Sequence, residues 1–434
     1  MTESGQTVQR PTAQPTTRQR PARSKSPSNR GRVLILVQNL SVPFDRRVWL
    51  ECLSLIDAGF SVAVVCPKAP GDPSYAQVNG VELYKYRPYA PGGSSISFVL
   101  EYLYSFLATL VLSLRASLRG RFVAVQSCNP PDLFWPIGLL FRMLHRSAFV
   151  FDHHDLCPEL YQSRFPNGHQ IVYRALRRME QCTMRAADHV IATNDSYRHI
   201  VVGRDGVDPA CVTVVRTGPD LNRLRRTSAD PSLRRSRPHL VAYLGVMGPQ
   251  DGVDIVLDMA DVVVHQLGRD DISFTLMGSG DCFDELVAQR DQLDLSDFVT
   301  FTGRIPDEEV AAILSTADVG ISPDPKNPLN DVSTMNKTME YMAFAVPVVA
   351  FDLRETRISA GEAAVYATPN DVGELAKLLV DLIDDEPRRR SMGTTGRDRV
   401  EKELAWDHQA PHYVRVYEQL TTASRRGVPA TAGA

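Results

Sequence analysis

The residues best suited to chemistry gather at positions 327–351, where a polar loop precedes a helix and a short apolar strand. Asn336 opens the predicted helix, Pro347 ends it, and residues 348–351 form an apolar run typical of a buried parallel strand. The N-terminus of a helix attracts phosphate, because its free backbone N–H groups carry a partial positive charge. Glu340, one turn inside the helix, can accept hydrogen bonds from a ribose diol. Together these features predict a nucleotide site.

The same segment resembles the nucleotide-sugar loop of retaining glycosyltransferases of family 4, which have two Rossmann-like domains facing each other across a cleft (the GT-B architecture). Members carry two spaced glutamates, the second of which opens the pattern E-A-M-A-x-G-x-P-V-V, and residues 340–349 match that second half. Val332 stands where the first glutamate is expected, with Asp331 beside it. The resemblance is to a subgroup whose donor loop reads D-V-S-T-M-N-K-x-x-E-Y-M. It implies that Glu340 binds the ribose and that Asp331 stands in for the displaced glutamate. The implied phosphate-binding loop consists of Ser333, Thr334, Met335, Asn336 and Lys337.

Polar side chains also crowd the end of another predicted strand, residues 148–152. His153, His154 and Asp155 follow directly, and three polar groups at a strand end are costly to bury unless they are used or paired. The resemblance implies that His154 contacts the donor sugar and shapes its pose, with His153 and Asp155 on the acceptor side. The alternative is a structural His–Asp pair that fixes the turn.

Short glycine-containing turns follow three predicted strands in the second half of the chain. The resemblance implies that these turns cradle the nucleotide with backbone atoms, and that an arginine plane stacks on the base. The residues concerned are Gly245, Gly278, Gly280, Gly303 and Arg304. An ordinary surface arginine is the alternative for Arg304.

The cations that relatives place at the diphosphate are missing from their usual positions. The related pattern G-R-L-x-x-x-K-G holds an arginine and a lysine there, whereas this chain has Val246 and Asp251. A leaving diphosphate must be neutralised as the glycosidic bond breaks. We expect Lys337 to supply the main positive charge; a solvated helix lysine is the alternative.

Near the N-terminus, the sequence around Asp45, Arg46 and Arg47 replaces a Gly-Gly loop that faces acceptor and donor phosphate in relatives. The two arginines are therefore candidates for binding an anionic acceptor or for supplying the missing charge. The alternative is that Asp45 caps a helix carrying two exposed arginines.

An alternation of apolar strands and helices predicts two α/β domains, each with a parallel sheet covered by helices. Strands are expected at residues 33–37, 61–66, 122–126, 148–152, 189–193 and 212–215, and then at 239–245, 273–277, 299–302, 319–322 and 348–351. The polar segment 227–238 is the expected linker. The full expectation is a disordered basic tail (1–32), an N-terminal acceptor domain (33–226), a C-terminal nucleotide-sugar domain (239–404), a helix crossing back to the N-terminal domain (405–420) and a loose tail (421–434).

The composition of the 434-residue chain is that of a globular protein, with 43% hydrophobic and 23% charged residues. A net charge of −3 argues against a nucleic-acid binder, which normally carries a strong basic excess. The chain has seven cysteines, an odd number, and no two of them form a C-x-x-C pair. This is typical of reduced cysteines in a cytosolic protein rather than of a disulfide framework or a zinc site.

Two segments indicate contact with a membrane. Residues 1–32 are basic and contain no aromatic side chain, which suits either a solvated tail or an anchor for anionic lipid headgroups. Residues 96–115 are apolar and about as long as a membrane span. Glu101, several hydroxyl side chains and a position between two strands favour a helix of the soluble domain instead. That helix is either buried or lays an apolar face on the membrane surface.

We therefore expect a retaining glycosyltransferase that needs no metal or other cofactor, with the donor's β-phosphate oxygens acting as base. It would move a sugar from a nucleotide sugar, with UDP favoured over GDP, to a saccharide or lipid-linked acceptor of cell-surface glycan synthesis. The expected location is the cytoplasm or the cytoplasmic face of the membrane. A non-hydrolysing nucleotide-sugar epimerase and a non-catalytic nucleotide-sugar-binding subunit are the alternatives. A nicotinamide-dependent dehydrogenase is excluded, because no G-x-G-x-x-G follows residues 33–37.

Overall fold

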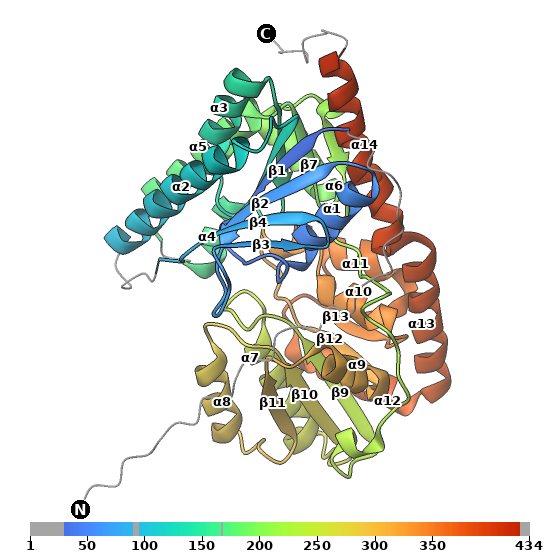
Figure 1. The fold of residues 1–434 in the computed structure, drawn as a ribbon. Coiled ribbons are helices and arrows are strands. Elements are labelled where there is room, and N and C mark those ends of the chain that lie inside the picture. Colours follow the sequence, from blue (N-terminus) through green and yellow to red (C-terminus); the bar gives the residue numbers. More distant parts are fainter. Residues whose placement is uncertain (1–29, 90–94, 166–167, 426–434) are drawn as a thin grey trace, which may run out of the picture.

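The computed structural model describes residues 30–89, 95–165 and 168–425, which form two α/β domains, one above the other in Figure 1. Within these residues, the N-terminal sheet has eight strands in the order β3-β4-β2-β1-β5-β6-β7-β8, and the C-terminal sheet has six in the order β11-β10-β9-β12-β13-β14. Neighbouring strands run parallel, except that β3 is antiparallel to β4. The predicted fold class, two parallel-sheet α/β domains of the GT-B type, is confirmed.

The strands of the N-terminal domain are β1 (Arg32–Leu36), β2 (Ser61–Pro67), β3 (Tyr75–Val78), β4 (Val81–Tyr86), β5 (Ala124–Cys128), β6 (Ala148–His153), β7 (His189–Ala192) and β8 (Val212–Val214). Those of the C-terminal domain are β9 (His239–Leu244), β10 (Ile272–Met277), β11 (Val299–Gly303), β12 (Val319–Ser322), β13 (Val348–Phe351) and β14 (Ala364–Ala367).

The helices of the N-terminal domain are α1 (Arg46–Asp57), α2 (Ser95–Ser117), α3 (Trp135–His145), α4 (Cys157–Arg164), α5 (Gln170–Ala186) and α6 (Asp195–Asp205). The C-terminal domain adds α7 (Val253–Asp261), α8 (Phe283–Gln292), α9 (Asp307–Thr316), α10 (Asn336–Ala343), α11 (Arg354–Ala360), α12 (Val372–Asp384) and α13 (Glu386–Arg399). The last helix is α14 (Trp406–Arg425).

Each predicted strand is present, with ends within two residues of those expected, but β3, β4 and β14 were not predicted. The β3–β4 hairpin is an edge element whose first strand is largely solvent-facing, so it lacks the apolar run that marks the central strands. Asn79-Gly80 joins the two strands with positive φ at both residues (50° and 84°). An Asn-Gly turn of this kind is a sequence signal for a hairpin, and it was the signal available for finding β3 and β4.

Helix α1 begins as predicted, because the Asp45 side chain caps it and accepts a hydrogen bond from the Val48 N–H at 3.1 Å. At the other end, Ala58 is the cap. Gly59 follows with φ of +89° and lets the chain turn into β2.

Helix α14 crosses from the C-terminal domain and runs along the side of the N-terminal domain (Figure 1). Its Trp406, Tyr413, Val416 and Tyr417 are buried in the same hydrophobic cluster as side chains of β1, β2 and α1. The Trp406 indole N–H also donates to Ser54 Oγ on α1 at 3.0 Å. This is the crossing arrangement that the resemblance implied, although the helix extends to Arg425, into the segment expected as a loose tail.

The expected linker, residues 227–238, is pinned to the C-terminal domain rather than free. It contains a short 3₁₀ turn at Pro231–Arg234, and Arg234 forms an ion pair with Asp318. The Asp230 N–H donates to Thr316 Oγ1 on α9 at 2.9 Å.

The segment that was long enough for a membrane span is α2, a helix of the N-terminal domain. Within the described parts of the chain, no helix combines the length and the apolar character that crossing a bilayer requires. The predicted tails at residues 1–29 and 426–434 lie outside the described residues.

Candidate active site

The candidate residues lie on the loops that follow the carboxyl ends of the strands of both sheets, and these loops meet at the domain boundary. Three contacts across that boundary show the meeting directly. Arg46 Nη1 donates to Glu340 Oε1 at 3.3 Å, and Asn194 Nδ2 donates to Thr334 Oγ1 at 3.0 Å. The Arg304 guanidinium also lies 4.8 Å from the centre of the Phe44 ring.

The predicted glycines leave bare backbone at the ends of β9, β10 and β11. A side chain on Gly278 would place its Cβ 1.8 Å from the Gly245 carbonyl oxygen, and one on Gly280 would lie 2.5 Å from the Met247 carbonyl oxygen. Gly278 N–H donates to the Gly303 carbonyl at 3.0 Å, and Gly303 itself has φ of +66°. Gly278 and Gly280 thus allow the ends of β9 and β10 to pack closely, with no side chain between their backbones.

The loop before α10 is held in place by two residues of the N-terminal domain that sequence reasoning missed. Asn194 donates to the Val332 carbonyl at 2.9 Å as well as to Thr334, and the Tyr197 hydroxyl lies 3.0 Å from Ser333 Oγ. Asn194 also caps α6, and that capping position after a strand was the signal its sequence offered. Two of the predicted donor-loop residues are therefore tied to the opposite domain.

Asp331 does not point toward the other predicted donor-loop residues. Its carboxylate accepts a hydrogen bond from the Arg354 N–H at the start of α11 (3.0 Å) and lies 3.5 Å from Lys326 Nζ. It caps a helix and pairs with a lysine, so its geometry does not support the role of a displaced donor-sugar glutamate.

The N-terminus of α10 carries Met335, Asn336 and Lys337 as predicted, but the three side chains differ in environment. Met335 is the cap residue and packs against the core of the C-terminal domain, while Asn336 is exposed. Lys337 is 8% exposed and its Nζ lies 2.6 Å from Asp324 Oδ1, so the alternative of a solvated lysine is wrong. Burial opposes its charge, yet Asp324 and Asp251 more than offset that effect and raise the pKa of Lys337.

Asp251 occupies the position where relatives carry a lysine, and its carboxylate accepts hydrogen bonds from the Gly248 N–H (2.9 Å) and Gln250 Nε2 (3.1 Å). Burial raises the pKa of Asp251 to about 6, an effect that Lys337 partly opposes. Lys337 is therefore a cation paired with the buried Asp324 and attracted by the half-buried Asp251.

Glu340 belongs to a cluster of charged side chains that spans the two domains. Its Oε1 accepts from Arg46 Nη1 at 3.3 Å and from Arg223 Nη2 at 3.4 Å. Both arginines also pair with Asp307 at the start of α9, at 3.1 Å for Arg46 and 2.5 Å for Arg223. Arg46 is thus placed near the predicted donor loop, and Arg223 was missed because its surroundings in the sequence are merely polar and basic.

His154 sits over a buried network that sequence reasoning did not anticipate. Its Nε2 is 2.5 Å from Asp152 Oδ2, to which it can donate a hydrogen bond, and 2.9 Å from Arg47 Nε. Arg47 also pairs with Asp152 (2.9 Å) and Glu51 (3.0 Å) and donates to the Val215 carbonyl (2.9 Å). Burial opposes ionisation of Asp152, but Arg47 and His154 hold the pKa of that carboxyl well below its usual range. The His154 ring is therefore fixed by an ionised carboxylate, with 15% of its side chain exposed.

Two acceptor-side candidates are turned inward. Arg47 is only 6% exposed and its guanidinium is fully engaged in the buried network. Of the two arginines expected to be exposed on α1, only Arg46 is exposed. His153 is fully buried at the end of β6, 3.5 Å from Glu180, with its ring between those of Phe151 and Tyr197. These positions argue against direct contact of either residue with an acceptor.

Asp155 lies in the loop after β6 and is half-buried, and burial raises the pKa of its carboxyl. Asn129, at the end of the neighbouring strand β5, organises this loop. Its Oδ1 accepts from the His154 and Asp155 backbone N–H groups (2.5 and 3.1 Å), and its Nδ2 donates to the Asp155 carbonyl (2.6 Å). The backbone that presents His154 is thus set by a side chain that no sequence pattern singled out.

Four side chains of the network, Glu51, Cys128, Asp152 and His154, lie close enough together to hold a metal ion. The Arg47 guanidinium, however, already lies within 2.9–3.0 Å of both carboxylates and of the imidazole. A cation in that position already balances the negative charge, so these residues do not fit a metal site.

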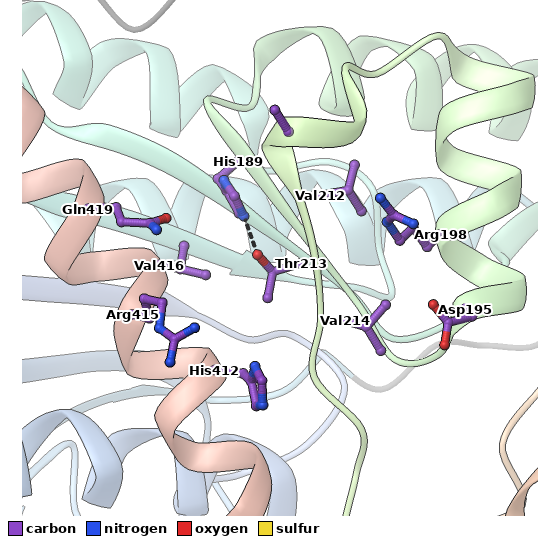
Figure 2. A pocket seen from close by; sticks show the side chains of 11 residues that line it. His189, Asp195, Arg198, Val212, Thr213, Val214, His412, Arg415, Val416 and Gln419 are labelled. Carbon is purple, nitrogen blue, oxygen red and sulfur yellow. Dashed lines mark hydrogen bonds between the residues drawn. The ribbon is translucent and has the colours of Figure 1, made fainter.

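A separate cavity of about 480 Å³ lies beside the edge strand β8 and α14 (Figure 2). Its charged lining consists of Arg198 and Arg415 together with Asp195, and His412 lies beside them. His189 is hydrogen-bonded to Thr213 at 2.8 Å, and burial lowers its pKa to about 4. None of the residues predicted for the donor or acceptor site lines it.

Two family models match successive parts of the chain. The one described as "Glycosyl transferase 4-like domain" matches residues 46–218, and the one described as "Glycosyl transferases group 1" matches residues 238–385. These matches fall on the two domains of the structure. The chain is therefore built of two glycosyltransferase domains.

Curated relatives carry glycosyltransferase names. The chain is 28% identical over 272 residues to D-inositol 3-phosphate glycosyltransferase of Thermomonospora curvata, covering 58% of this chain and 61% of that one. It is 34% identical over 131 residues to MMP alpha-(1->4)-mannosyltransferase of Mycolicibacterium hassiacum, covering 30% and 31%. A third relative is a GDP-mannose-dependent phosphatidylinositol monomannoside mannosyltransferase of Corynebacterium glutamicum, 27% identical over 53% of this chain and 58% of its own. The matches thus span less than two thirds of each relative.

Solved structures share the fold over most of the chain. Sucrose-phosphate synthase from Thermosynechococcus elongatus aligns with a TM-score of 0.74 and 18% identity, covering 91% of this chain and all of that one. HepE of Anabaena in complex with UDP-glucose aligns at 0.65 and 16% identity, with 91% and 100% covered. At these identities the likeness establishes the architecture alone.

Proposed function

We propose that this chain of two glycosyltransferase domains is a retaining glycosyltransferase whose nucleotide-sugar donor binds between them. The observation that carries the proposal is the arrangement at the boundary. Glu340, one turn inside α10, the loop before that helix and the glycine-containing ends of β9, β10 and β11 all belong to one edge of the C-terminal sheet. A carboxylate for a ribose diol, a helix N-terminus for phosphate and open backbone for a base are the parts that a nucleotide requires.

In this proposal Glu340 accepts hydrogen bonds from the ribose, and Ser333–Lys337 with the α10 N-terminus hold the diphosphate. Lys337 supplies positive charge, part of which Asp324 and Asp251 balance. Arg46, which pairs with Glu340, is a second cation near the donor loop. His154 contacts the sugar from the N-terminal domain, where Asp152 and Arg47 fix its ring. The acceptor hydroxyl then attacks from the side on which the diphosphate leaves, and a β-phosphate oxygen takes its proton. The anomeric configuration is retained.

A UDP-sugar is the favoured donor. HepE of Anabaena, which shares the fold, was solved with UDP and with UDP-glucose, whereas curated relatives of Corynebacterium glutamicum and Mycobacterium tuberculosis are named GDP-mannose-dependent. The acceptor class is a saccharide or a lipid-linked saccharide, which is consistent with the phosphatidylinositol mannoside named for those relatives. A lipid-linked acceptor would place the protein peripherally on a membrane.

The proposed reaction needs no metal, because the α10 N-terminus and Lys337 act where a metal would otherwise neutralise the diphosphate. The test is incubation of the purified chain with UDP- and GDP-sugars and membrane-extracted acceptors, with and without a chelator. We expect release of one nucleoside diphosphate, unchanged by the chelator, and NMR of the product should show the donor's anomeric configuration. Inversion of that configuration, or activity that a chelator abolishes and a divalent ion restores, would contradict the mechanism.

A nucleotide-sugar-binding subunit without turnover is a second candidate, and one observation favours it. The two groups central to catalysis are already engaged: Lys337 by Asp324 and Glu340 by Arg46 and Arg223. Nucleotide binding without product from any acceptor would support it. The epimerase alternative is weakened, because Glu51 and Asp152 are fully buried behind Arg47 and are not placed for proton transfer.

A further inference from the structure

The distribution of polar and apolar side chains on α2 is the reverse of that on an ordinary surface helix. Its buried face includes three hydroxyl residues, Ser105, Thr109 and Ser113, each no more than 2% exposed. Its solvent face carries a stripe of large apolar residues at intervals of three or four: Leu100, Leu103, Leu107, Val111 and Leu114. Leu118, just past the end of the helix, continues the stripe, and the exposed fractions range from 39% to 86%. A surface helix of a soluble protein shows the opposite arrangement.

The stripe continues onto a neighbouring helix. Helix α3 packs on the same hydrophobic cluster as α2, and its Met143 and Leu144 are 76% and 52% exposed. Helix α5 packs against α3 and adds the exposed Ile171, and the three helices lie along one side of the N-terminal domain (Figure 1). From Leu100 to Leu118 the stripe is about 27 Å long at the rise of an α-helix. We call the exposed side chains of α2, α3 and α5 the outer face.

The exposed charged side chains of the segment that carries the outer face are of one sign. Among the described residues from 100 to 188, they are all arginines: Arg115, Arg119, Arg121, Arg146, Arg164, Arg174, Arg178 and Arg185. Arg164 is directed to the C-terminal domain, 3.4 Å from Asp281, and Arg119 lies 3.6 Å from the half-buried Glu82 of β4. The acidic residues of the same stretch are buried or half-buried, and several pair with cations, as Asp188 does with Arg142. An apolar stripe edged with arginines complements a surface that is apolar within and anionic at its rim.

We propose that the outer face rests on an anionic lipid surface, with the leucines of α2 among the acyl chains and the arginines at the headgroups. Interfacial helices combine an apolar face with a basic border in this way, and long basic side chains reach from an apolar surface to the headgroups. The geometry also connects this face to the proposed active site. Gln38, just after β1, donates to Glu101 at 3.2 Å, so the first described turns of α2 lie beside a strand end at the domain boundary. Resting on the proposed function, this places the site where a lipid-linked acceptor can enter from the membrane.

The test is sedimentation of the full chain with phosphatidylcholine vesicles, with or without phosphatidylglycerol, in the absence of donor and acceptor. Leu103→Asn, Leu107→Asn and Val111→Asn together change three exposed positions that make little contact with the core. A control chain carries Leu267→Asn and Ile358→Asn, which are exposed apolar positions in the C-terminal domain. We expect wild type and control to bind anionic vesicles, more weakly at high salt, and the triple variant to bind at least roughly tenfold more weakly.

Equal binding by the triple variant would overturn the proposal and assign vesicle binding to another segment, such as the basic residues 1–32. No binding by the wild type would overturn it as well. A dimer that forms without vesicles and is lost in the triple variant would make the face a contact between two copies. The vesicle assay measures binding alone, so a negative result there does not contradict the proposed sugar transfer. A failed transfer assay likewise does not contradict the proposed binding to lipid.

Discussion

At the scale of single residues, the site depends on charges that are paired within the protein. Lys337 lies between Asp324 and Asp251, and Asp152 is held ionised beneath His154. Sequence patterns located Lys337, Glu340 and His154, because loops after strands and helix N-termini leave recognisable signatures. Most of their partners, such as Arg46, Arg223 and Asp324, come from other elements and carry no such signature. Asp324 and Asn129 acquire their roles only when the sheets bring their strand ends together.

Removing the Lys337 ammonium leaves a buried carboxylate without its partner. We expect Lys337→Ala to lower the free energy of unfolding by about 3 kcal/mol, because the carboxyl group of Asp324, which is 2% exposed, loses its partner. The double variant Lys337→Met with Asp324→Asn should recover most of that loss, as urea denaturation would show. If Lys337 also neutralises the donor, the stable double variant should bind nucleoside diphosphate more weakly than the wild type. Undiminished binding by the double variant would remove Lys337 from the phosphate site.

Asp251 makes the stability of the fold depend on pH. Burial raises the pKa of its carboxyl to about 6 from an ordinary value of 3.8, so the folded state opposes its ionisation. The free-energy cost of ionising this carboxyl in the folded state reaches its full value above pH 6. It decreases as the pH falls through 6 toward 4, because the carboxyl becomes protonated. Asp251→Asn should therefore stabilise the protein by about 2 kcal/mol at pH 8, with a gain about 1 kcal/mol smaller at pH 5. Denaturant titrations at both pH values measure this difference, and a gain independent of pH would show that Asp251 titrates normally.

At the scale of elements, the central strands and the loop–helix–strand unit of α10 and β13 were predictable, because buried parallel strands are apolar runs bounded by turns. The edge elements β3, β4 and β14 lack that contrast. The environment of α2 could not be predicted either, since a mostly apolar helix with a few hydroxyl residues does not show which face is turned inward. Its leucines would be expected inside, and the structure turns five of the helix's aliphatic side chains outward.

Helix α14 should stabilise the N-terminal domain although it follows the C-terminal one. Trp406 is 5% exposed and bonds to Ser54 on α1, so Trp406→Ala should lower the free energy of unfolding by roughly 3 kcal/mol through the cavity it leaves. Arg415→Ala, on the exposed side of the same helix, should change stability by less than about 0.5 kcal/mol. Thermal unfolding followed by circular dichroism compares the two. Equal stability of both variants would mean that α14 does not dock on α1 in solution.

At the scale of the whole molecule, the two domains meet through polar and charged contacts. Arg46 and Glu340 pair across the boundary, Ser196 Oγ donates to Glu355 Oε1 at 2.6 Å, and Asn194 holds the loop before α10. Interfaces of this polar kind allow domains to open and close around a ligand. A bound donor must then displace the arginines from Glu340, so ligand binding and domain closure compete for the same carboxylate.

The most direct test of a donor site at Glu340 is calorimetric titration of UDP and GDP into the wild type, Glu340→Gln and Asp307→Asn. Both variants lose one carboxylate partner of Arg46 and Arg223, but only Glu340 is assigned to the ribose. We predict that the wild type binds one of the two nucleotides, with UDP favoured. Glu340→Gln should weaken that binding by roughly tenfold or more, the loss expected for a hydrogen bond to a charged group, while Asp307→Asn binds as well as the wild type. Equal weakening in both variants, or no binding of either nucleotide to the wild type, would contradict a nucleotide site between the domains.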